Sequence, residues 1–306
     1  LLASRLDAMN HRVVGLTRGN PERFRPNPTP GLGAPSIGAA TSYSIPALDD
    51  STAELDRLER QAVLGQEMEA VWLKRVGFED GSTILDLGSG LGLTSFLAAR
   101  VFPQARVIGI EPDDELRKRA EQRAAELGFG ERCSFLAGTG EELPLADDSV
   151  DFAYSRFLFQ HLRRPDRVIA ELARVTRSGG VIALVDVDDA GVVMHPEPPG
   201  FRRFQEQVTA AQATLGGDRN VGRKLAAYLR AAGLKKARTD VVPLSSHIFP
   251  TAALVEIAFD FKAQTLKRVG TWTSAEARVL ESLQEMSAQE DAWVFIPVFL
   301  AHASVP

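Results

Sequence analysis

The sequence has one cysteine, no long hydrophobic run and no excess of basic residues. A single Cys133 excludes an internal disulfide and a cysteine-rich metal site, and it agrees with a reducing cytoplasm, where we expect the protein to reside. No uninterrupted apolar stretch approaches the roughly 20 residues that a membrane helix needs, and the N-terminus lacks a signal-peptide pattern. We therefore expect no membrane partner, and we interpret Cys133 as a buried residue at a strand start.

The charge balance excludes another class of partner. The 306 residues contain 35 Lys and Arg against 40 Asp and Glu, a formal net charge of −5. Phosphate binding draws most of its free energy from clustered Lys and Arg, whereas here they alternate with acids, as in residues 57–60. Mixed charges of this kind are typical of a solvated helix face. We expect no nucleic-acid partner.

The first 50 residues divide into a short helix and a linker. Apolar residues recur at helical spacing in residues 1–18, which predicts an amphipathic helix. Residues 19–50 are rich in proline and glycine, which sustain neither a helix nor a strand ladder. The helix buries its apolar face either on its own chain or on a neighbouring subunit. The second arrangement makes the protein a homo-oligomer joined through this helix, which we expect.

Residues 51–190 alternate between helical and strand patterns. The capping-box spacing from Ser51 to Glu54 predicts one long helix that reaches Trp72. Apolar runs predict five strands with helices between them; the strands span 83–87, 106–110, 133–137, 151–155 and 181–187, and two of the helices span 114–127 and 167–175. Such βα alternation predicts an α/β protein with a mostly parallel, doubly wound sheet.

Residues 191–306 predict a loop, four helices and two more strands. The loop covers 195–200, the helices cover 201–213, 221–232, 252–261 and 274–286, and the strands cover 237–242 and 292–301. With these strands the sheet has seven. We expect the helices to cap a substrate site above a cofactor-binding core formed by residues 51–190.

A glycine-rich turn follows the first predicted strand. Asp86 precedes the turn, in which Gly88, Gly90 and Gly92 alternate. Each glycine removes a Cβ, so a ligand can touch the backbone. A dinucleotide fingerprint would place its third Gly or Ala at position 93, where this sequence has Leu93. The acidic Asp86 also suits a cationic amino-acid ligand better than a pyrophosphate.

Glu111 ends the second predicted strand, 19 positions after Gly92. A carboxylate at a strand end can accept hydrogen bonds from both hydroxyls of a ribose. Nicotinamide enzymes use the same device, so Glu111 does not separate a nicotinamide dinucleotide from other ribose-containing cofactors.

The segment from Ala137 to Asp151 does separate them, because its Gly-Thr-Gly-Glu-Glu-Leu-Pro stretch and acidic turn resemble class I S-adenosylmethionine-dependent methyltransferases. The similarity spans residues 51–190 and is greatest to the small-molecule branch in actinomycete natural-product pathways. It implies a Rossmann-like fold, S-adenosyl-L-methionine as cofactor, S-adenosyl-L-homocysteine as product and no metal. It also places adenine beside Thr139, Gly140 and Glu141, with Thr139 in place of the family's usual Asp.

The same resemblance assigns the end of the fourth strand to the methionine part of the cofactor. Ser155 and Arg156 lie there, although Arg156 could instead pair with an acid. Four further residues would cover or line the acceptor site: Tyr43 as a lid, with Phe159, Gln160 and Phe204.

Three residues are candidates for the base that takes a proton from the acceptor, namely His161, Asp186 and His195. Each has an alternative interpretation. His161 could bond neighbouring backbone, Asp186 could cap a turn, and His195 could be an ordinary loop residue. Methyl transfer from a sulfonium otherwise needs alignment and exclusion of water.

The 16 phenylalanines against three tyrosines favour an apolar acceptor if several of them line the pocket. Their π faces could then stabilise a cation formed by methylation of a carbon–carbon double bond. We predict methyl transfer to a hydrophobic small molecule of secondary metabolism, with carbon favoured over oxygen or nitrogen. The alternatives are a nicotinamide-dependent oxidoreductase and a cyclase or scaffold that binds the cofactor without transferring methyl.

Overall fold

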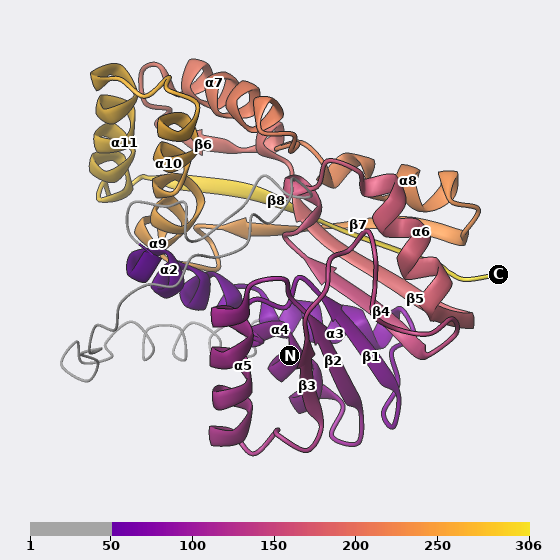
Figure 1. The fold of residues 1–306 in the computed structure, drawn as a ribbon. Coiled ribbons are helices and arrows are strands. Elements are labelled where there is room, and N and C mark those ends of the chain that lie inside the picture. Colours follow the sequence, from indigo (N-terminus) through magenta and orange to yellow (C-terminus); the bar gives the residue numbers. More distant parts are fainter. Residues whose placement is uncertain (1–50) are drawn as a thin grey trace.

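A computed structural model describes residues 51–306 of the chain (Figure 1). The predicted N-terminal helix, the linker with Tyr43 and the proposed oligomerisation arm lie outside the described residues. The helix predicted from Ser51 to Trp72 is two helices, α2 (Ser51–Val63) and α3 (Gln66–Arg75). Gly65 separates them with φ of 79°. A left-handed residue cannot continue a right-handed helix, so the single-helix prediction was wrong.

Five parallel strands form the first part of the sheet, in the order β3-β2-β1-β4-β5. They are β1 (Thr83–Leu87), β2 (Arg106–Ile110), β3 (Cys133–Leu136), β4 (Val150–Arg156) and β5 (Thr176–Val187). The helices α4 (Leu93–Val101), α5 (Asp114–Glu126) and α6 (Pro165–Val175) connect them. Parallel strands covered on both faces are apolar along their length, which is why short apolar runs located them.

Three antiparallel strands complete an eight-stranded sheet. The long strand β8 (Trp293–Ser304) pairs with β5 through residues 298–304 and with β6 (Val193–His195) through residues 293–295. On its other edge β8 pairs with β7 (Lys235–Ser245). The count of seven was therefore one short, because the sequence predicted no strand at Val193–His195, which forms β6. His195 belongs to that strand rather than to a loop.

The remaining helices form two groups (Figure 1). α8 (Leu225–Ala231) lies near α6, whereas α7 (Phe201–Thr214), α9 (Thr251–Val255), α10 (Lys262–Arg268) and α11 (Ser274–Ser287) gather at the opposite end of the molecule. A π-helical turn, Glu256–Asp260, separates α9 from α10. The sequence predicted one helix at residues 252–261 and missed α10. Among the helices of residues 51–306, none has the length and hydropathy to cross a lipid bilayer.

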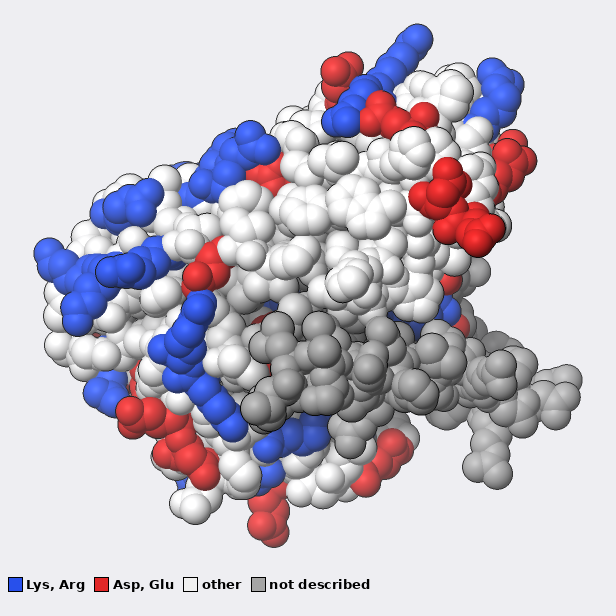
Figure 2. All heavy atoms as spheres, turned by 180° about the vertical axis from the view of Figure 1, so that it is seen from behind, with Lys and Arg blue, Asp and Glu red and all other residues white. Residues whose placement is uncertain are grey.

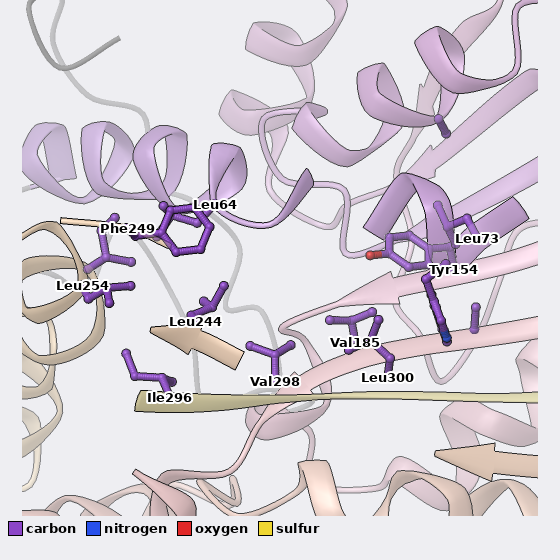
Figure 3. Packing of buried hydrophobic residues seen from close by; sticks show 14 of the residues in the cluster. Leu64, Leu73, Tyr154, Val185, Leu244, Phe249, Leu254, Ile296, Val298 and Leu300 are labelled. Carbon is purple, nitrogen blue, oxygen red and sulfur yellow. The ribbon is translucent and has the colours of Figure 1, made fainter. Parts of the chain in front are cut away.

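The hydrophobic core is continuous from the sheet into the cap helices (Figure 3). Tyr154 and Leu300 pack with Leu73 of α3 at one end of it. At the other end Leu244 and Ile296 of β7 and β8 pack near the α9 region. Fully burying a large apolar side chain contributes about 1.5–3 kcal/mol. A shared core of this kind holds the cap helices against the sheet.

Candidate functional site

A cavity of about 460 Å³ opens at the carboxyl ends of β1, β2 and β4. Its walls come from α2, the turn after β1, the ends of β2 and β3, the segment after β4, and Phe261 with Arg268 at the two ends of α10. Open α/β sheets bind ligands at this edge, where the strand order reverses. The volume lies within the range of small-molecule sites.

The glycine turn forms one wall, and its glycines have different roles. Gly88 and Gly90 line the cavity, with φ of 75° and 50°. A Cβ on Gly90 would meet no atom within 4 Å, so space for a ligand remains there. Gly92 has φ of 74°, and a Cβ on it would come within 2.8 Å of Phe135 and Phe96. Gly92 therefore serves packing beneath the turn.

Glu111 joins this turn to the end of β2. Its Oε2 accepts a hydrogen bond from the Gly90 N–H at 3.1 Å, and its Oε1 accepts one from the Asp113 N–H at 3.0 Å. Burial raises the pKa of Glu111, while these two backbone hydrogen bonds oppose the rise. Each carboxylate oxygen has a second lone pair, so Glu111 can also accept from two ribose hydroxyls. The carboxylate and the Cβ-free turn fit the sugar and amino-acid ends of S-adenosylmethionine.

Asp86 lies behind the turn and does not line the cavity. Its Oδ2 accepts a hydrogen bond from the Ser95 hydroxyl at 2.6 Å, which ties β1 to the first turn of α4. Burial raises the pKa of Asp86 to about 7. Asp86 therefore supports the turn from behind, which corrects the prediction that it contacts the cofactor.

Thr139, Gly140 and Glu141 line the opposite side of the cavity, where the family resemblance places adenine. A Cβ on Gly140 would approach Val168 of α6 at 3.0 Å and Leu87 at 3.3 Å. The backbone therefore runs close to α6. The assignment of these residues to adenine stays a prediction.

Arg156 lines the cavity and is fixed by four contacts. Its Nε donates to Glu69 at 2.9 Å, and its Nη2 donates to the carbonyl oxygens of Leu64 at 3.0 Å and Gln61 at 3.3 Å. Its guanidinium stacks on Phe157, 4.4 Å from the ring centroid. Arg156 therefore connects the α2–α3 junction to the end of β4.

Ser155 has a structural contact instead. Its side chain is buried and donates to the Leu87 carbonyl, so the predicted cofactor contact is not formed by Ser155. The strand register pairs Leu87 with Ser155, which places the next residues, Gly88 and Arg156, side by side. This neighbourhood supports the prediction that Arg156 meets the methionine end of the cofactor.

His161 lines the cavity beside the sheet edge. Its Nδ1 lies 3.1 Å from the Nε2 amide of Gln212, which also donates to the Gln160 carbonyl at 3.0 Å. An amide NH₂ can only donate, so this geometry assigns the imidazole proton to Nε2. Burial, followed by the charge of Arg219, lowers the pKa of His161 to about 3. The imidazole is neutral at physiological pH.

Asp186 and His195 lie outside the cavity wall. Asp186 is buried, and its carboxylate accepts from the Gln160 N–H at 3.0 Å and from the Val187 N–H at 2.8 Å. Burial raises the pKa of Asp186 to about 7. The His195 side chain is 71% exposed, with Nε2 3.8 Å from Asp291. Asp186 caps a turn and His195 is a surface residue, so the proposed role as base is corrected for both.

The phenylalanines divide in the same way. Phe157, Gln160 and Phe261 line the cavity. Phe159 and Phe204 are buried in the core and do not reach it, which corrects their predicted substrate role. Phe157 has φ of 55° and donates its N–H to the Val185 carbonyl at 2.7 Å. Its left-handed backbone turns the chain at the end of β4.

A buried ionic cluster, Asp189 with Arg219 and Lys262, lies next to this wall and was missed by the sequence reasoning. Asp189 pairs with Arg219 at 2.9 Å and with Lys262 at 2.7 Å. Burial opposes ionisation, but the two cations lower the pKa of Asp189 to about 2. Burial lowers the pKa of Lys262 to about 8. No local sequence pattern signals this cluster, because its members come from distant segments.

Within residues 51–306, no group of three or more His, Cys, Asp or Glu side chains is placed to hold a metal ion. The charged groups of the cavity are carboxylates in the segments after β2 and β3, and guanidinium groups on α2, β4 and α10.

Comparison with known proteins defines the class. Residues 85–184 match the family model of a methyltransferase domain. An uncharacterized 37.1 kDa protein of a Streptomyces fradiae transposon is 30% identical over 225 residues, which cover 73% of this chain and 62% of that protein. This chain therefore spans less than two thirds of that relative.

Two solved structures share the fold. The [4+2]-cyclase SpnF aligns with a TM-score of 0.54 and 20% identity, over 79% of this chain and 81% of that one. A geranyl diphosphate C-methyltransferase from Streptomyces coelicolor aligns with a TM-score of 0.51 and 18% identity, over 83% and 82%.

The fold and the cavity thus define a Rossmann-like, class I methyltransferase domain. Residues 85–184 therefore form a methyltransferase domain, which confirms the predicted class and agrees with the predicted cofactor, S-adenosylmethionine.

Proposed function

We propose that the chain transfers methyl from S-adenosylmethionine to a hydrophobic small molecule of secondary metabolism. The observation that carries the proposal is the position of Glu111, whose carboxylate is bonded to the Gly90 N–H inside the cavity. This contact fixes the carboxylate that would accept hydrogen bonds from the ribose against the glycine turn that would receive the rest of the cofactor. A rigid site aligns the reacting atoms before the chemical step, which lowers the entropic part of the barrier.

The protein's own part in this reaction is to bind, to orient and to exclude water. The cofactor supplies an electrophilic methyl group on a sulfonium when bound. Glu111 and the turn would hold its sugar, and Arg156 its amino-acid end. Helix α2 and Phe261 close the cavity from the cap side, which limits access of water.

The cavity combines apolar wall residues with a weak base. Leu58, Leu158 and Leu162 line the cavity together with Phe157 and Phe261, which supports an apolar acceptor. His161 stays neutral, but its lowered pKa makes it a poor proton acceptor at neutral pH. This combination favours a nucleophile that needs no prior deprotonation by the protein, such as an electron-rich carbon. The preference for carbon over oxygen or nitrogen belongs to this proposal.

Two alternatives remain outcomes of the same test. A nicotinamide-dependent oxidoreductase would also use Glu111. A cyclase or scaffold that binds the cofactor without methyl transfer would use the same fold, which the [4+2]-cyclase SpnF shares.

Calorimetry with S-adenosylhomocysteine, and separately with NADH, tests the proposal on the full chain. We expect binding of S-adenosylhomocysteine alone. Glu111→Ala should weaken it about tenfold to a hundredfold, because hydrogen bonds to a charged group contribute about 1.5–3 kcal/mol. Glu115→Ala is the matched control, since Glu115 is an exposed residue of α5 paired with Arg119.

The outcomes separate the alternatives. Binding of NADH without S-adenosylhomocysteine would support the oxidoreductase. Cofactor binding without appearance of labelled methyl in any product, across extracts of the producing cells, would support the cyclase or scaffold.

A further inference from the structure

The buried ionic cluster contains two cations for one carboxylate. The side chains of Asp189, Arg219 and Lys262 are 5%, 4% and 1% exposed. They come from the turn after β5, the segment before α8, and the first residue of α10. Lys262 also donates to the Gln205 amide oxygen at 2.7 Å, which is a neutral partner.

The other polar groups packed around the cluster do not supply a second full negative charge. Asp186 lies near Arg219, but burial raises its pKa to about 7, so part of it is protonated at neutral pH. Asp188 is engaged by Arg223. His161 is neutral. Within the described part of the chain, the cluster therefore carries a net positive charge, which is costly to bury without a partner anion.

The positive charge lies directly behind the part of the cavity wall that Gln160 and Phe261 form. Arg219 donates to the side-chain oxygen of Gln160, and its guanidinium lies 5.2 Å from the ring centroid of Phe261. Gln160 and Phe261 both line the cavity, and Lys262 follows Phe261 in the chain. The guanidinium of Arg57, another wall residue, lies 4.5 Å from the same ring. At such separations a charge acts strongly, because the interior screens it less than water does.

The aromatic walls are therefore already associated with cations. Phe157 is in contact with Arg156, and Phe261 with Arg57 and Arg219. Arg156 is paired with Glu69, so the unbalanced charge comes from Arg219 and Lys262, which share Asp189. This charge would repel a positive charge formed on a bound molecule and attract a negative one. The suggestion that phenylalanine faces stabilise a substrate cation is thus opposed by the net charge behind Phe261.

We propose that the acceptor side of the cavity, at Gln160, His161 and Phe261, binds the acceptor as an organic anion with an apolar body. Enolates and phenolates, which have carbon atoms that can take the methyl group, have this chemistry. The inference rests on the proposed methyl transfer and names its substrate class. An anionic acceptor forms the new bond to the methyl carbon with its own electron pair. The electron pair of the broken carbon–sulfur bond stays on sulfur, and no proton has to be removed in that step.

Three probes of equal shape and different charge test the inference. Benzoate is an anion, benzamide is neutral and benzamidine is a cation. Each is titrated into the full chain saturated with S-adenosylhomocysteine, and binding is followed by calorimetry and by the melting temperature. We expect benzoate to bind roughly tenfold tighter than benzamide, which corresponds to one hydrogen bond to a charged group. Benzamidine should bind more weakly than either.

Two variants change the net charge of the cluster in opposite directions. Lys262→Met should abolish the preference for benzoate. Asp189→Asn leaves both cations uncompensated, so benzoate should raise its melting temperature more than that of the wild type. Lys262→Gln replaces Lys262→Met if the latter does not fold. Lys235→Met is the control, because Lys235 is exposed on β7, and the wild-type order of probes should persist.

Equal binding of the three probes, including no binding of any, would overturn the inference, and so would an unchanged preference in the Lys262 variants. The proposed function fails separately, through lack of S-adenosylhomocysteine binding before any probe is added.

Discussion

At the scale of single residues, the environment determines which titratable groups take part in the chemistry. His161, Asp186 and Glu111 all lie near one sheet edge, where the two carboxyls are buried and the histidine is partly buried, yet their surroundings differ. The pKa of the histidine is lowered, and those of the two carboxyls are raised, by the same cause, because burial disfavours whichever form carries charge. Only Glu111 and His161 also line the cavity.

The pKa of His161 predicts a dependence of stability on pH. Its folded-state pKa of about 3 lies below the ordinary 6.5, so the unfolded chain binds more protons between these values. The contribution of His161 is therefore fully present above pH 6.5 and is lost as pH falls toward 3. When the pH falls from 6.5 to 5, the free energy of unfolding of the wild type should decrease by about 2 kcal/mol more than that of His161→Asn.

Urea denaturation at the two pH values measures this difference. His195→Asn is the control, because His195 is exposed, and it should follow the wild type. An identical pH dependence of His161→Asn and wild type would show that His161 is not held neutral by the fold.

Arg156 gives a second prediction at this scale. If it meets the cofactor's carboxylate, Arg156→Met should weaken S-adenosylhomocysteine about tenfold and leave 5′-methylthioadenosine, which lacks the amino-acid group, unchanged. Arg156→Lys should restore part of the difference. Arg230→Met, at an exposed position of α8, serves as control. Equal loss for both ligands would mean that Arg156 acts only through Glu69 and the α2–α3 junction.

At the scale of elements, the turn between β1 and α4 separates binding from packing. Gly90 and Gly92 both have positive φ, but only Gly92 lacks room for a side chain. A Cβ added to Gly92 would lie 2.8 Å from the rings of Phe96 and Phe135, so both rings would have to shift, whereas a Cβ on Gly90 would meet open space in the cavity.

Alanine substitutions should therefore act differently in this turn. Gly92→Ala should lower the free energy of unfolding by about 2–4 kcal/mol, from backbone strain plus overpacking. Gly90→Ala carries only the strain, about 1–2 kcal/mol, but should weaken S-adenosylhomocysteine by partly filling its site. Gly81 also has a positive φ, and a Cβ on it would meet no atom within 4 Å. Gly81→Ala therefore serves as the control for backbone strain alone. Chemical denaturation and calorimetry measure the two effects, and a reversed order would contradict this division.

At the scale of the whole molecule, the cap helices and the sheet share one core and jointly form the cavity. The basic residues seen in Figure 2 lie on a surface that also carries acidic residues, as expected for a net charge of −5.

The proposed homo-oligomer depends on residues 1–18. Their deletion should reduce the mass measured in solution by light scattering to that of a monomer, whereas deletion of an equal length within the linker, residues 24–41, should not. An unchanged mass after the first deletion would exclude oligomerisation through this arm.

The sequence by itself determined the order and type of most elements, and it located the glycine turn and Glu111, which line the cavity. Strand bounds such as Thr83–Leu87 and Arg106–Ile110 agree with the predicted ones, because buried parallel strands leave a local apolar signature. The glycine turn and Glu111 were recognisable because the backbone conformation and the strand end are local properties too. The junction at Gly65, β6 and α10 were not, since their formation depends on packing against distant segments.

Only the tertiary structure decided which polar side chains reach the cavity. Asp186 lies at the end of a strand, where catalytic acids are often found, yet its carboxylate accepts hydrogen bonds from two backbone N–H groups. Asp189 pairs with Arg219, 30 positions away, and Lys262 bonds Gln205, 57 positions away. The charge that faces the acceptor is thus a sum over residues that are remote in sequence, and Coulomb interaction depends on distance in space.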